Sequence, residues 1–235
     1  MTEKFRLETI AKISKYAQGA NGWTTEYSFK LVNRFLRGKS ILEMGPAEGL
    51  MTKFLYDTGL NLTIVEASES FCLDLTKKYP NAKVTNSLFE DFNPEKKFDN
   101  IILGHVLEHI EDPKLLLQRI KNWLNPNGLV LCAVPNSRSL HRQAAVLMGI
   151  LDFEEALNEA DKHHGHRRVY NPETFRSEFL SSGYKIVFFG GYWIKPFSNK
   201  QCEETHSPEM IEAFMQLGER YPDISAEIFI AASVK

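Results

Sequence analysis

The sequence contains little cysteine, and none of it is arranged for chemistry. Only three cysteines occur in 235 residues, and Cys72, Cys132 and Cys202 are far apart and form no C-x-x-C pair. A disulfide-stabilised secreted domain or a cysteine-ligated zinc site needs paired or closely spaced thiols. We therefore expect reduced thiols in a cytoplasmic protein, and we assign them no function.

The sequence also lacks an excess of charge of either sign and lacks long hydrophobic runs. Its 28 basic and 30 acidic residues give a formal net charge of −2, which provides no overall attraction for a polyanion and argues against a dedicated nucleic-acid-binding protein. No window approaches the length of a membrane span, and the N-terminus does not resemble a signal peptide. We expect a soluble cytoplasmic protein that binds neither nucleic acid nor membrane.

Short apolar runs alternate with helical patterns along most of the chain. Hydrophobic residues make up 43% of the composition, so one sizeable core and a single domain are expected. Strands that are apolar on both faces and alternate with helices predict a parallel sheet covered by helices on both sides. The expected strands lie at residues 40–44, 61–67, 98–103, 128–134, 184–189 and 226–234, with a weak one near 82–85. Seven strands in this pattern indicate an α/β fold.

Three dipeptides mark where helices begin between those strands. Asp112-Pro113, Asn171-Pro172 and Ser207-Pro208 each combine an N-cap residue with a proline at the first helical position. The first of these helices is expected to carry Trp123 on its buried face. The last one precedes the strand at 226–234, which should return to the sheet beside its predecessor.

A glycine-rich turn follows the first expected strand. The segment reads Glu43-Met44-Gly45-Pro46-Ala47-Glu48-Gly49 and leads into a helix, which lets a nucleotide contact bare backbone; a tight turn needed only for packing is the alternative. The dinucleotide fingerprint G-x-G-x-x-G fails at Ala47 and Leu50, and no G-K-[ST] of a phosphate-binding loop is present. With an acidic residue two positions before the first glycine, the turn resembles the first motif of class I S-adenosylmethionine-dependent methyltransferases.

Three further segments extend this resemblance over residues 40–134. Glu66 ends the next strand about 20 residues after the turn, the spacing at which a carboxylate meets ribose hydroxyls. The segment 87–92 is similar to the family segment that encloses adenine, and 99–113 looks like the segment whose turn faces the methyl donor. The resemblance implies that S-adenosyl-L-methionine is bound by Glu43, Gly45, Pro46, Ala47, Gly49, Glu66, Ala67, Ser87, Leu88, Phe89, Gly104 and His105. It also implies a three-layer αβα, Rossmann-like fold with a seven-stranded, mainly parallel sheet and an antiparallel last strand.

The turn after the strand at 98–103 contains two histidines. Residues 105–109 spell H-x-x-E-H, which a zinc protease needs on one helix; here the segment straddles a strand end and a turn, so we discount zinc proteolysis. Relatives that make ubiquinone carry E-x-x-E-H at this place and are thought to hold magnesium, but His105 replaces their first glutamate, and no metal is expected. His109 is a candidate general base, or alternatively a histidine that only supports the turn.

The segment 161–170 is rich in groups that donate hydrogen bonds or carry positive charge. Relatives often have a histidine followed by an aromatic residue just before the next helix, so His166, a second candidate base, resembles a known position. Arginine is a strong bidentate partner of phosphate or carboxylate. The expected substrate-binding residues are His163, His164, Arg167, Arg168 and Tyr170. They predict an anionic acceptor, with a solvated charged loop as the alternative. Metal binding by the three close histidines of this segment is a further alternative, but it lacks a partner acid at a suitable spacing.

These features divide the single domain, 1–235, into four parts. They are an N-terminal helical lid (1–38), a cofactor-binding half (39–134), an inserted lid (135–170) and the C-terminal half of the sheet (171–235). Trp23 and Tyr27 are expected to cover the cofactor. Lys195 and Asn199 can reach the acceptor, although a loop packed against the sheet explains them equally well.

The function expected from the sequence is methyl transfer from S-adenosyl-L-methionine to an oxygen or nitrogen of a small, anionic metabolite, by a monomer or homodimer. One alternative is an aminopropyl transferase, but the acidic pair it needs cannot be placed. Another is a cofactor-binding protein that has lost catalysis and serves in regulation or assembly. The near-neutral charge disfavours a macromolecular acceptor.

Overall fold

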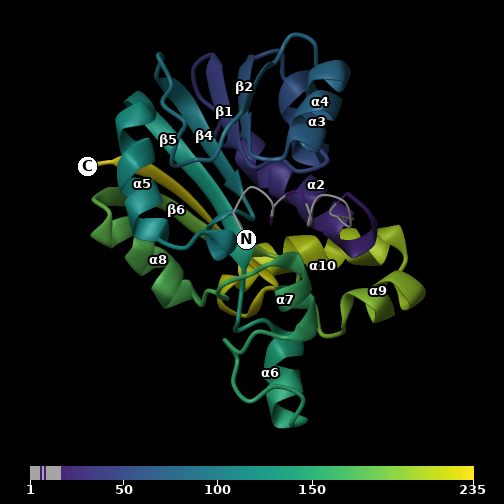
Figure 1. Ribbon diagram of the computed structural model, residues 1–235. Coiled ribbons are helices and arrows are strands. Elements are labelled where there is room, and N and C mark those ends of the chain that lie inside the picture. The colour runs from purple at the N-terminus through teal and green to yellow at the C-terminus, as the bar shows by residue number, and fades with distance from the viewer. Residues whose placement is uncertain (1–5, 7, 9–16) are drawn as a thin grey trace.

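The computed structural model describes residues 6, 8 and 17–235, and the centre of this part is a seven-stranded sheet (Figure 1). The strand order is β3-β2-β1-β4-β5-β7-β6. The strands are β1 (Ser40–Met44), β2 (Asn61–Glu66), β3 (Lys83–Asn86), β4 (Phe98–Gly104), β5 (Leu124–Pro135), β6 (Tyr184–Tyr192) and β7 (Glu227–Val234). Every strand predicted from the sequence is present, including the weak one at β3.

The sheet is parallel except for the two pairings of β7. This strand lies between β5 and β6 and pairs antiparallel with both, with Cys132 opposite Ile230 in one of the two registers. The remaining neighbours pair parallel. The prediction of an antiparallel last strand beside its predecessor is confirmed. The carboxyl ends of β1, β2, β4 and β5 meet at one edge, where α/β sheets bind ligands.

Helices cover both faces of the sheet, because successive residues of a buried strand point to opposite sides. In β5, Cys132 belongs to a core shared with α5 (Pro113–Ile120) and α8 (Pro172–Ser181), whereas Leu131 belongs to the core on the other face. That second face is covered by α2 (Gly19–Asn33), α3 (Leu50–Asp57), α4 (Glu69–Lys78) and α10 (Pro208–Arg220). The three-layer αβα prediction is confirmed (Figure 1).

The helix starts follow the predicted caps. At Asp112, Asn171 and Ser207 the side chain accepts a hydrogen bond from the backbone N–H three residues later, which satisfies a group left unpaired at a helix start. The prediction for Trp123 was wrong, because α5 ends at Ile120 and the chain tightens into the 3-10 helix η2 (Lys121–Trp123) before β5. The indole is still buried in the same core.

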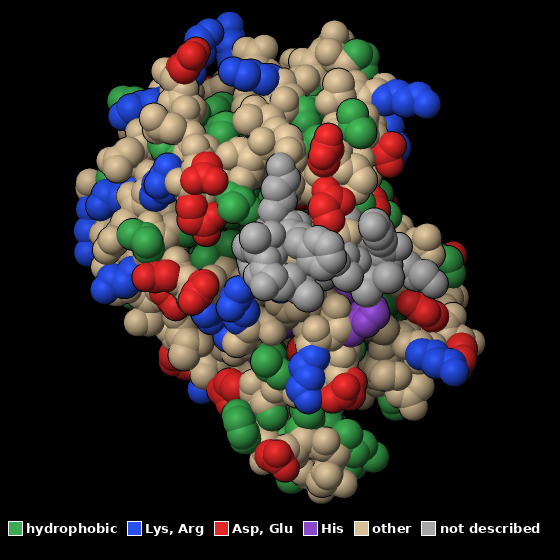
Figure 2. Space-filling view, viewed as in Figure 1, with side chains coloured by type: hydrophobic (Ala, Val, Ile, Leu, Met, Phe, Trp, Pro, Cys, Tyr) green, Lys and Arg blue, Asp and Glu red, His purple; other side chains and the backbone are tan. Residues whose placement is uncertain are grey.

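The insertion at residues 135–170 is folded and lies beyond the carboxyl edge of the sheet (Figure 1). It contains α6 (Leu140–Leu147) and α7 (Glu159–His164). Arg142 and Asp161 join these helices through a buried ion pair with a nitrogen to oxygen distance of 3.0 Å. Exposed apolar side chains gather at the tip of the insertion, around the end of α6 (Figure 2), namely Leu147, Met148, Ile150 and Phe153.

The remaining elements are short. They are α9 (Asn199–Thr205) and the 3-10 helices η1 (Leu107–His109) and η3 (Pro222–Ile224). Of the predicted N-terminal helical part, the structure shows α2, while residues 1–5, 7 and 9–16 lie outside the described residues. No helix in the described part of the chain is long and apolar enough to cross a membrane.

Candidate active site

A cavity of about 290 Å³ lies at the carboxyl edge of the sheet. Its wall is built from α2, the glycine turn after β1, the end of β2, the loop after β3, the turn after β4, the insertion and the segment after β6. All the predicted cofactor-binding residues except Gly49 and Ser87 line it. Segments that are far apart in the sequence therefore share one site.

The turn after β1 presents its backbone to this cavity. Gly45, Ala47 and Gly49 have φ angles of 65°, 51° and 81°, a left-handed conformation that favours small residues. A Cβ atom on Gly45 would lie 3.2 Å from the Phe89 ring at the cavity wall. On Gly49 it would lie 2.5 Å from Leu75. Gly49 is thus required for packing between α3 and α4 and does not line the cavity, although its neighbours Glu48 and Leu50 do.

One carboxylate connects this turn to the end of β2. Glu66 Oε1 accepts a hydrogen bond of 2.8 Å from the backbone N–H of Ser68, and Oε2 accepts one of 3.3 Å from that of Ala47. Burial raises the pKa of Glu66, although these N–H groups act in the opposite direction. The structure therefore brings Glu66 and the turn together, as the sequence predicted, and a nucleoside in the cavity can contact both.

A second carboxylate, Glu43, lies at the end of β1 in the same wall. It is 2% exposed, and neither oxygen has a hydrogen-bond donor among the described residues. Burial raises the pKa of Glu43 to about 8, and the negative charge of Glu66 acts in the same direction. The Thr52 side chain is the one hydrogen-bonding group that acts against this shift. A buried carboxyl group with so little hydrogen bonding suits a ligand that carries positive charge.

The loop after β3 forms the opposite wall. Leu88 and Phe89 line the cavity and offer it apolar surface. Ser87 does not, because its backbone N–H donates to the carbonyl of Glu66 at 2.9 Å and its hydroxyl donates to the carbonyl of Leu88 at 2.8 Å. Ser87 therefore fixes the loop to β2 instead of contacting the cavity.

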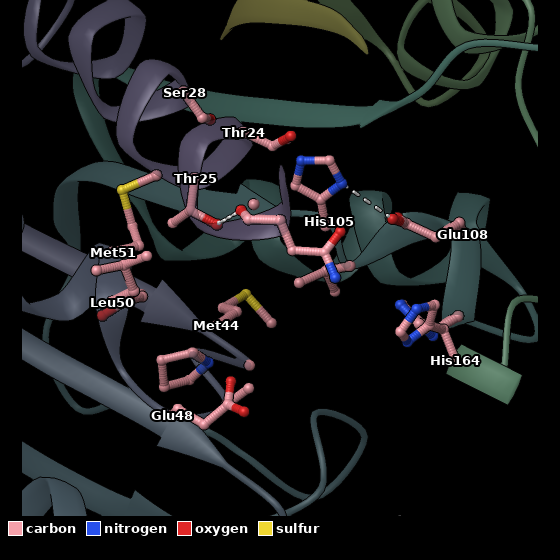
Figure 3. Close-up of a pocket in the computed structure, with 18 of the residues that line it drawn as sticks. Thr24, Thr25, Ser28, Met44, Glu48, Leu50, Met51, His105, Glu108 and His164 are labelled. Atoms are coloured by element: carbon pink, nitrogen blue, oxygen red, sulfur yellow. Dashed lines mark hydrogen bonds and ion pairs between the residues drawn. The ribbon is translucent and has the colours of Figure 1, made fainter. Parts of the chain in front are cut away.

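The turn after β4 directs His105 into the cavity with a φ angle of 57°. Its Nδ1 lies 3.5 Å from Oε1 of Glu108 and 3.8 Å from Oε2 of Glu227, and Figure 3 shows the ring facing Glu108. Burial acts to lower the pKa of His105, but the two carboxylates outweigh it and the pKa is raised. The inner end of the cavity therefore brings a partly buried imidazole close to two buried carboxyl groups.

His109 and His166 meet at this inner end, one from η1 and one from the insertion. Their ring centroids are 4.8 Å apart. Nδ1 of His109 lies 3.4 Å from the carbonyl oxygen of Gly165, and Nδ1 of His166 lies 3.2 Å from Oδ1 of Asp161. Burial lowers the pKa of His109 to about 4, so its ring is neutral near pH 7. His109 both lines the cavity and contacts the insertion, which fits both interpretations made from the sequence.

Most residues predicted to bind substrate lie outside the cavity. His164 lines it, whereas His163, Arg167, Arg168 and Tyr170 do not. The reason is that both arginines donate to carbonyl groups of the turn at residues 107–111, and Tyr170 is buried against Phe175. Of the five residues predicted to bind the acceptor, the structure therefore brings His164 alone to this cavity.

Several polar residues complete the wall. Lys195 and Asn199 line it, and Lys195 Nζ donates to Asn199 Oδ1 at 2.7 Å. Glu227 of β7 also lines the cavity and was not predicted to do so. The same is true of four residues of α2, namely Asn21, Thr24, Thr25 and Ser28, and the last three are labelled in Figure 3. Trp23 and Tyr27, predicted to cover the cofactor, do not line the cavity. No local pattern marks the α2 and β7 residues, because only tertiary packing brings these elements to the cavity.

The donor set here does not fit a magnesium ion of the kind thought to occur in ubiquinone-making relatives. Magnesium prefers oxygen ligands in octahedral geometry. The three positions of the E-x-x-E-H pattern are His105, Glu108 and His109 in this chain, so they offer a single carboxylate. We therefore derive no step of catalysis from magnesium.

Comparison with known proteins agrees with this geometry. A family model described as a methyltransferase domain matches residues 20–187. The chain is 24% identical over 172 residues to a ubiquinone biosynthesis O-methyltransferase of Coxiella burnetii, which covers 70% of this chain and 71% of the relative.

Two solved structures share the fold. The CcbJ methyltransferase from Streptomyces caelestis superposes with a TM-score of 0.66 at 13% identity, covering 100% of this chain and 99% of the other. The glycopeptide N-methyltransferase MtfA complexed with S-adenosyl-L-methionine gives a TM-score of 0.60 at 12% identity, covering 90% and 94%. Because the family match spans most of the chain, including the glycine turn and Glu66, the chain belongs to the methyltransferase-domain family and is a class I S-adenosyl-L-methionine-dependent methyltransferase.

Proposed function

We propose that the chain transfers the methyl group of S-adenosyl-L-methionine to an oxygen or nitrogen atom of a small molecule bound at the inner end of the cavity. The observation that carries this proposal is the continuity of one cavity. The turn at 45–47 and Glu66 form its cofactor end, and the cavity continues into a group of buried and partly buried ionisable side chains. Those side chains are His105, Glu108, His109, His166, Lys195 and Glu227.

Methyl transfer from a sulfonium is an in-line displacement with an activated leaving group. The acceptor lone pair forms a bond to the methyl carbon while the carbon–sulfur bond breaks, and the electron pair stays on sulfur. The protein mainly has to align the two reactants and exclude water. The acceptor also loses a proton, which a neutral histidine can take. We assign that role to His109 or His166, since both line the inner end.

The charge of the acceptor is proposed from the residues that line the cavity. The anionic acceptor predicted from Arg167 and Arg168 loses its support, because these side chains contact backbone. Glu108 and Glu227 are buried, and three of their carboxylate oxygens have no hydrogen-bond donor among the described residues. Such oxygens favour an acceptor that brings a hydroxyl or amine hydrogen. The O-methyltransferase activity named for the curated relatives supports a hydroxyl.

The test is turnover with release of S-adenosylhomocysteine, measured by a coupled assay on a panel of phenols, alcohols, amines, phosphates and carboxylates. We expect turnover with a hydroxyl or amine compound, and loss of at least about tenfold in kcat when His109 or His166 becomes alanine. A protein that binds the cofactor yet consumes none on any compound would support the alternative, a cofactor-binding regulatory or assembly protein. Turnover confined to phosphates or carboxylates would restore the anionic acceptor.

A further inference from the structure

The inner end of the cavity carries more potential ligand atoms than the single base proposed for methyl transfer requires. Glu108, His109 and His166 each offer one potential ligand atom, and these atoms all lie within 4.8 Å of one another. Two come from neighbouring residues of η1 and the third from the insertion, 57 residues further on. We infer that these three side chains form a site for a divalent transition-metal ion such as Zn²⁺.

The first support is the carboxylate. Glu108 is completely buried, and neither of its oxygens has a hydrogen-bond donor among the described residues. The ion-pair contact of 3.5 Å with His105 reaches only Oε1. A buried carboxylate is stable only when it is paired or coordinates a metal, so Glu108 has capacity for a further cation.

The second support is how the two imidazoles are held. Nδ1 of His109 faces the carbonyl oxygen of Gly165, and Nδ1 of His166 faces the carboxylate of Asp161. Both partners are acceptors, which favours the tautomer with the proton on Nδ1 and a lone pair on Nε2, although the contact of His166 falls short of hydrogen-bond geometry. In the metal-free chain this lone pair can take the proton of an acceptor; with a metal ion bound it serves as a ligand instead. Histidines that bind metals usually donate their other N–H to a carboxylate or carbonyl in this way, which fixes the ring and its tautomer.

The partner of His166 is itself fixed. Asp161 Oδ2 receives hydrogen bonds from Arg142 Nη1 at 3.0 Å and from the backbone N–H of Asn158 at 2.9 Å. A chain of contacts therefore runs from the interior of the insertion to the His166 ring. Such positioning favours a metal ligand over a histidine in a solvated loop.

The donor set selects the class of ion. Two imidazole nitrogens and one carboxylate suit zinc, iron, cobalt or nickel, whereas magnesium and calcium prefer oxygen ligands only. Zinc ligands stand about 2.0–2.2 Å from the ion in tetrahedral geometry, so two of them are about 3.3–3.6 Å apart. The ligand atoms here, all within 4.8 Å of one another, therefore have to move closer together when the ion binds. This site differs from the magnesium site of the relatives in its donors and in taking a ligand from the insertion.

The experiment is calorimetric titration of the full chain, stripped with EDTA, with Zn²⁺ and separately with Mg²⁺. We expect one Zn²⁺ per chain and no comparable uptake of Mg²⁺. Glu108→Gln, His109→Ala and His166→Ala should each weaken Zn²⁺ binding by more than the roughly 10–100-fold typical of losing an outer-shell partner, and Asp161→Asn by about that amount. The matched control is His163→Ala, since His163 lies on the same insertion but is exposed and outside the cavity.

Binding does not depend on turnover, so failure of the proposed methyl transfer leaves this test intact. Melting curves in EDTA will show which variants fold. If a variant does not fold, the site can still be tested on the unaltered chain. With Co²⁺ bound, its proton NMR spectrum should show two exchangeable, hyperfine-shifted imidazole N–H signals, and Zn²⁺ should abolish them. No stoichiometric Zn²⁺ uptake, tighter binding of Mg²⁺, or equal loss on His163→Ala and His166→Ala would overturn the proposal.

Discussion

Glu43 links cofactor binding to pH. Its carboxyl group has a pKa of about 8 because it is buried, so it is mostly protonated at pH 6 in the cofactor-free protein. S-adenosyl-L-methionine is cationic at its sulfonium and ammonium groups, which favours the ionised carboxylate. Cofactor affinity should therefore rise between about pH 6 and 8, and binding should release a proton. Calorimetry in buffers of different ionisation enthalpy measures that release.

The control for this prediction is Glu43→Gln, which should bind the cofactor without the proton release.

The raised pKa of Glu43 also affects the stability of the fold. The pKa of a glutamate is 4.5 without burial and about 8 here, so between these values the folded state binds more protons and the free energy of unfolding falls as pH rises. Proton uptake on binding, or a pH slope unchanged in Glu43→Gln, would contradict this role.

Glu66 is the residue on which cofactor affinity should depend most. Hydrogen bonds to a charged group are each worth about 1.5–3 kcal/mol. If the carboxylate accepts the ribose hydroxyls, Glu66→Ala should weaken binding of S-adenosylhomocysteine by about 10–100-fold or more. Glu69→Gln is a suitable control, because Glu69 is exposed and lies outside the cavity. Equal affinities for the two variants would remove Glu66 from the site.

At the scale of elements, Arg168 fastens the insertion to the turn after β4. Its guanidinium donates to the carbonyls of Leu107, Ile110 and Glu111. Arg168→Ala should lower the free energy of unfolding by about 1–3 kcal/mol, the range for losing charge-assisted hydrogen bonds that are partly exposed. Urea unfolding measures this. Lys162→Ala should leave the free energy of unfolding nearly unchanged, since Lys162 forms a fully exposed ion pair with Glu159.

Kinetics distinguish a structural role of Arg168 from the substrate-binding role that the sequence predicted for it. Loss of an arginine that binds an anionic acceptor raises KM for that acceptor and leaves stability unchanged. Loss of an arginine that holds the turn lowers stability. The second pattern is expected for Arg168→Ala.

The two helices of the insertion should depend on their buried ion pair. Removing one partner of such a pair typically costs about 3–5 kcal/mol, because the other charge remains buried. Arg142→Ala should therefore leave Asp161 without its arginine partner and speed amide hydrogen exchange across residues 140–164, while the strands of the sheet stay protected. Uniform protection in the variant would show that other contacts hold the insertion.

At the scale of the whole molecule, the sequence predicts what local patterns determine. Apolar runs identify the strands, and residues such as Asp112 and Ser207 mark helix starts, since caps act over three residues. The pairing of Glu66 with the glycine turn was predictable because two adjacent parallel strands end at one edge. The place of Glu227 in the site was not predictable, because no local sequence pattern shows that the antiparallel β7 brings its first residue beside His105.

The differences between the predicted substrate-binding residues and the residues that line the cavity have a similar cause. Arg168 and Tyr170 were assigned to the acceptor by their residue types and proximity in sequence, but direction depends on packing. The carbonyls of the 107–111 turn attract the guanidinium, and the core around Phe175 takes the tyrosine ring. The same packing turns His166 toward Glu108 and His109, which the sequence alone does not reveal.

In this fold the carboxyl ends of four parallel strands lie at one edge of the sheet, and α2 and the insertion cover that edge. The most direct test of this account is a crystal structure of the chain with S-adenosylhomocysteine. We predict ribose hydroxyls within hydrogen-bonding distance of the Glu66 carboxylate, the base against Leu88 and Phe89, and the sulfur directed toward His105. A nucleoside bound elsewhere, or bound here with Glu66 turned away from the ribose, would contradict the account.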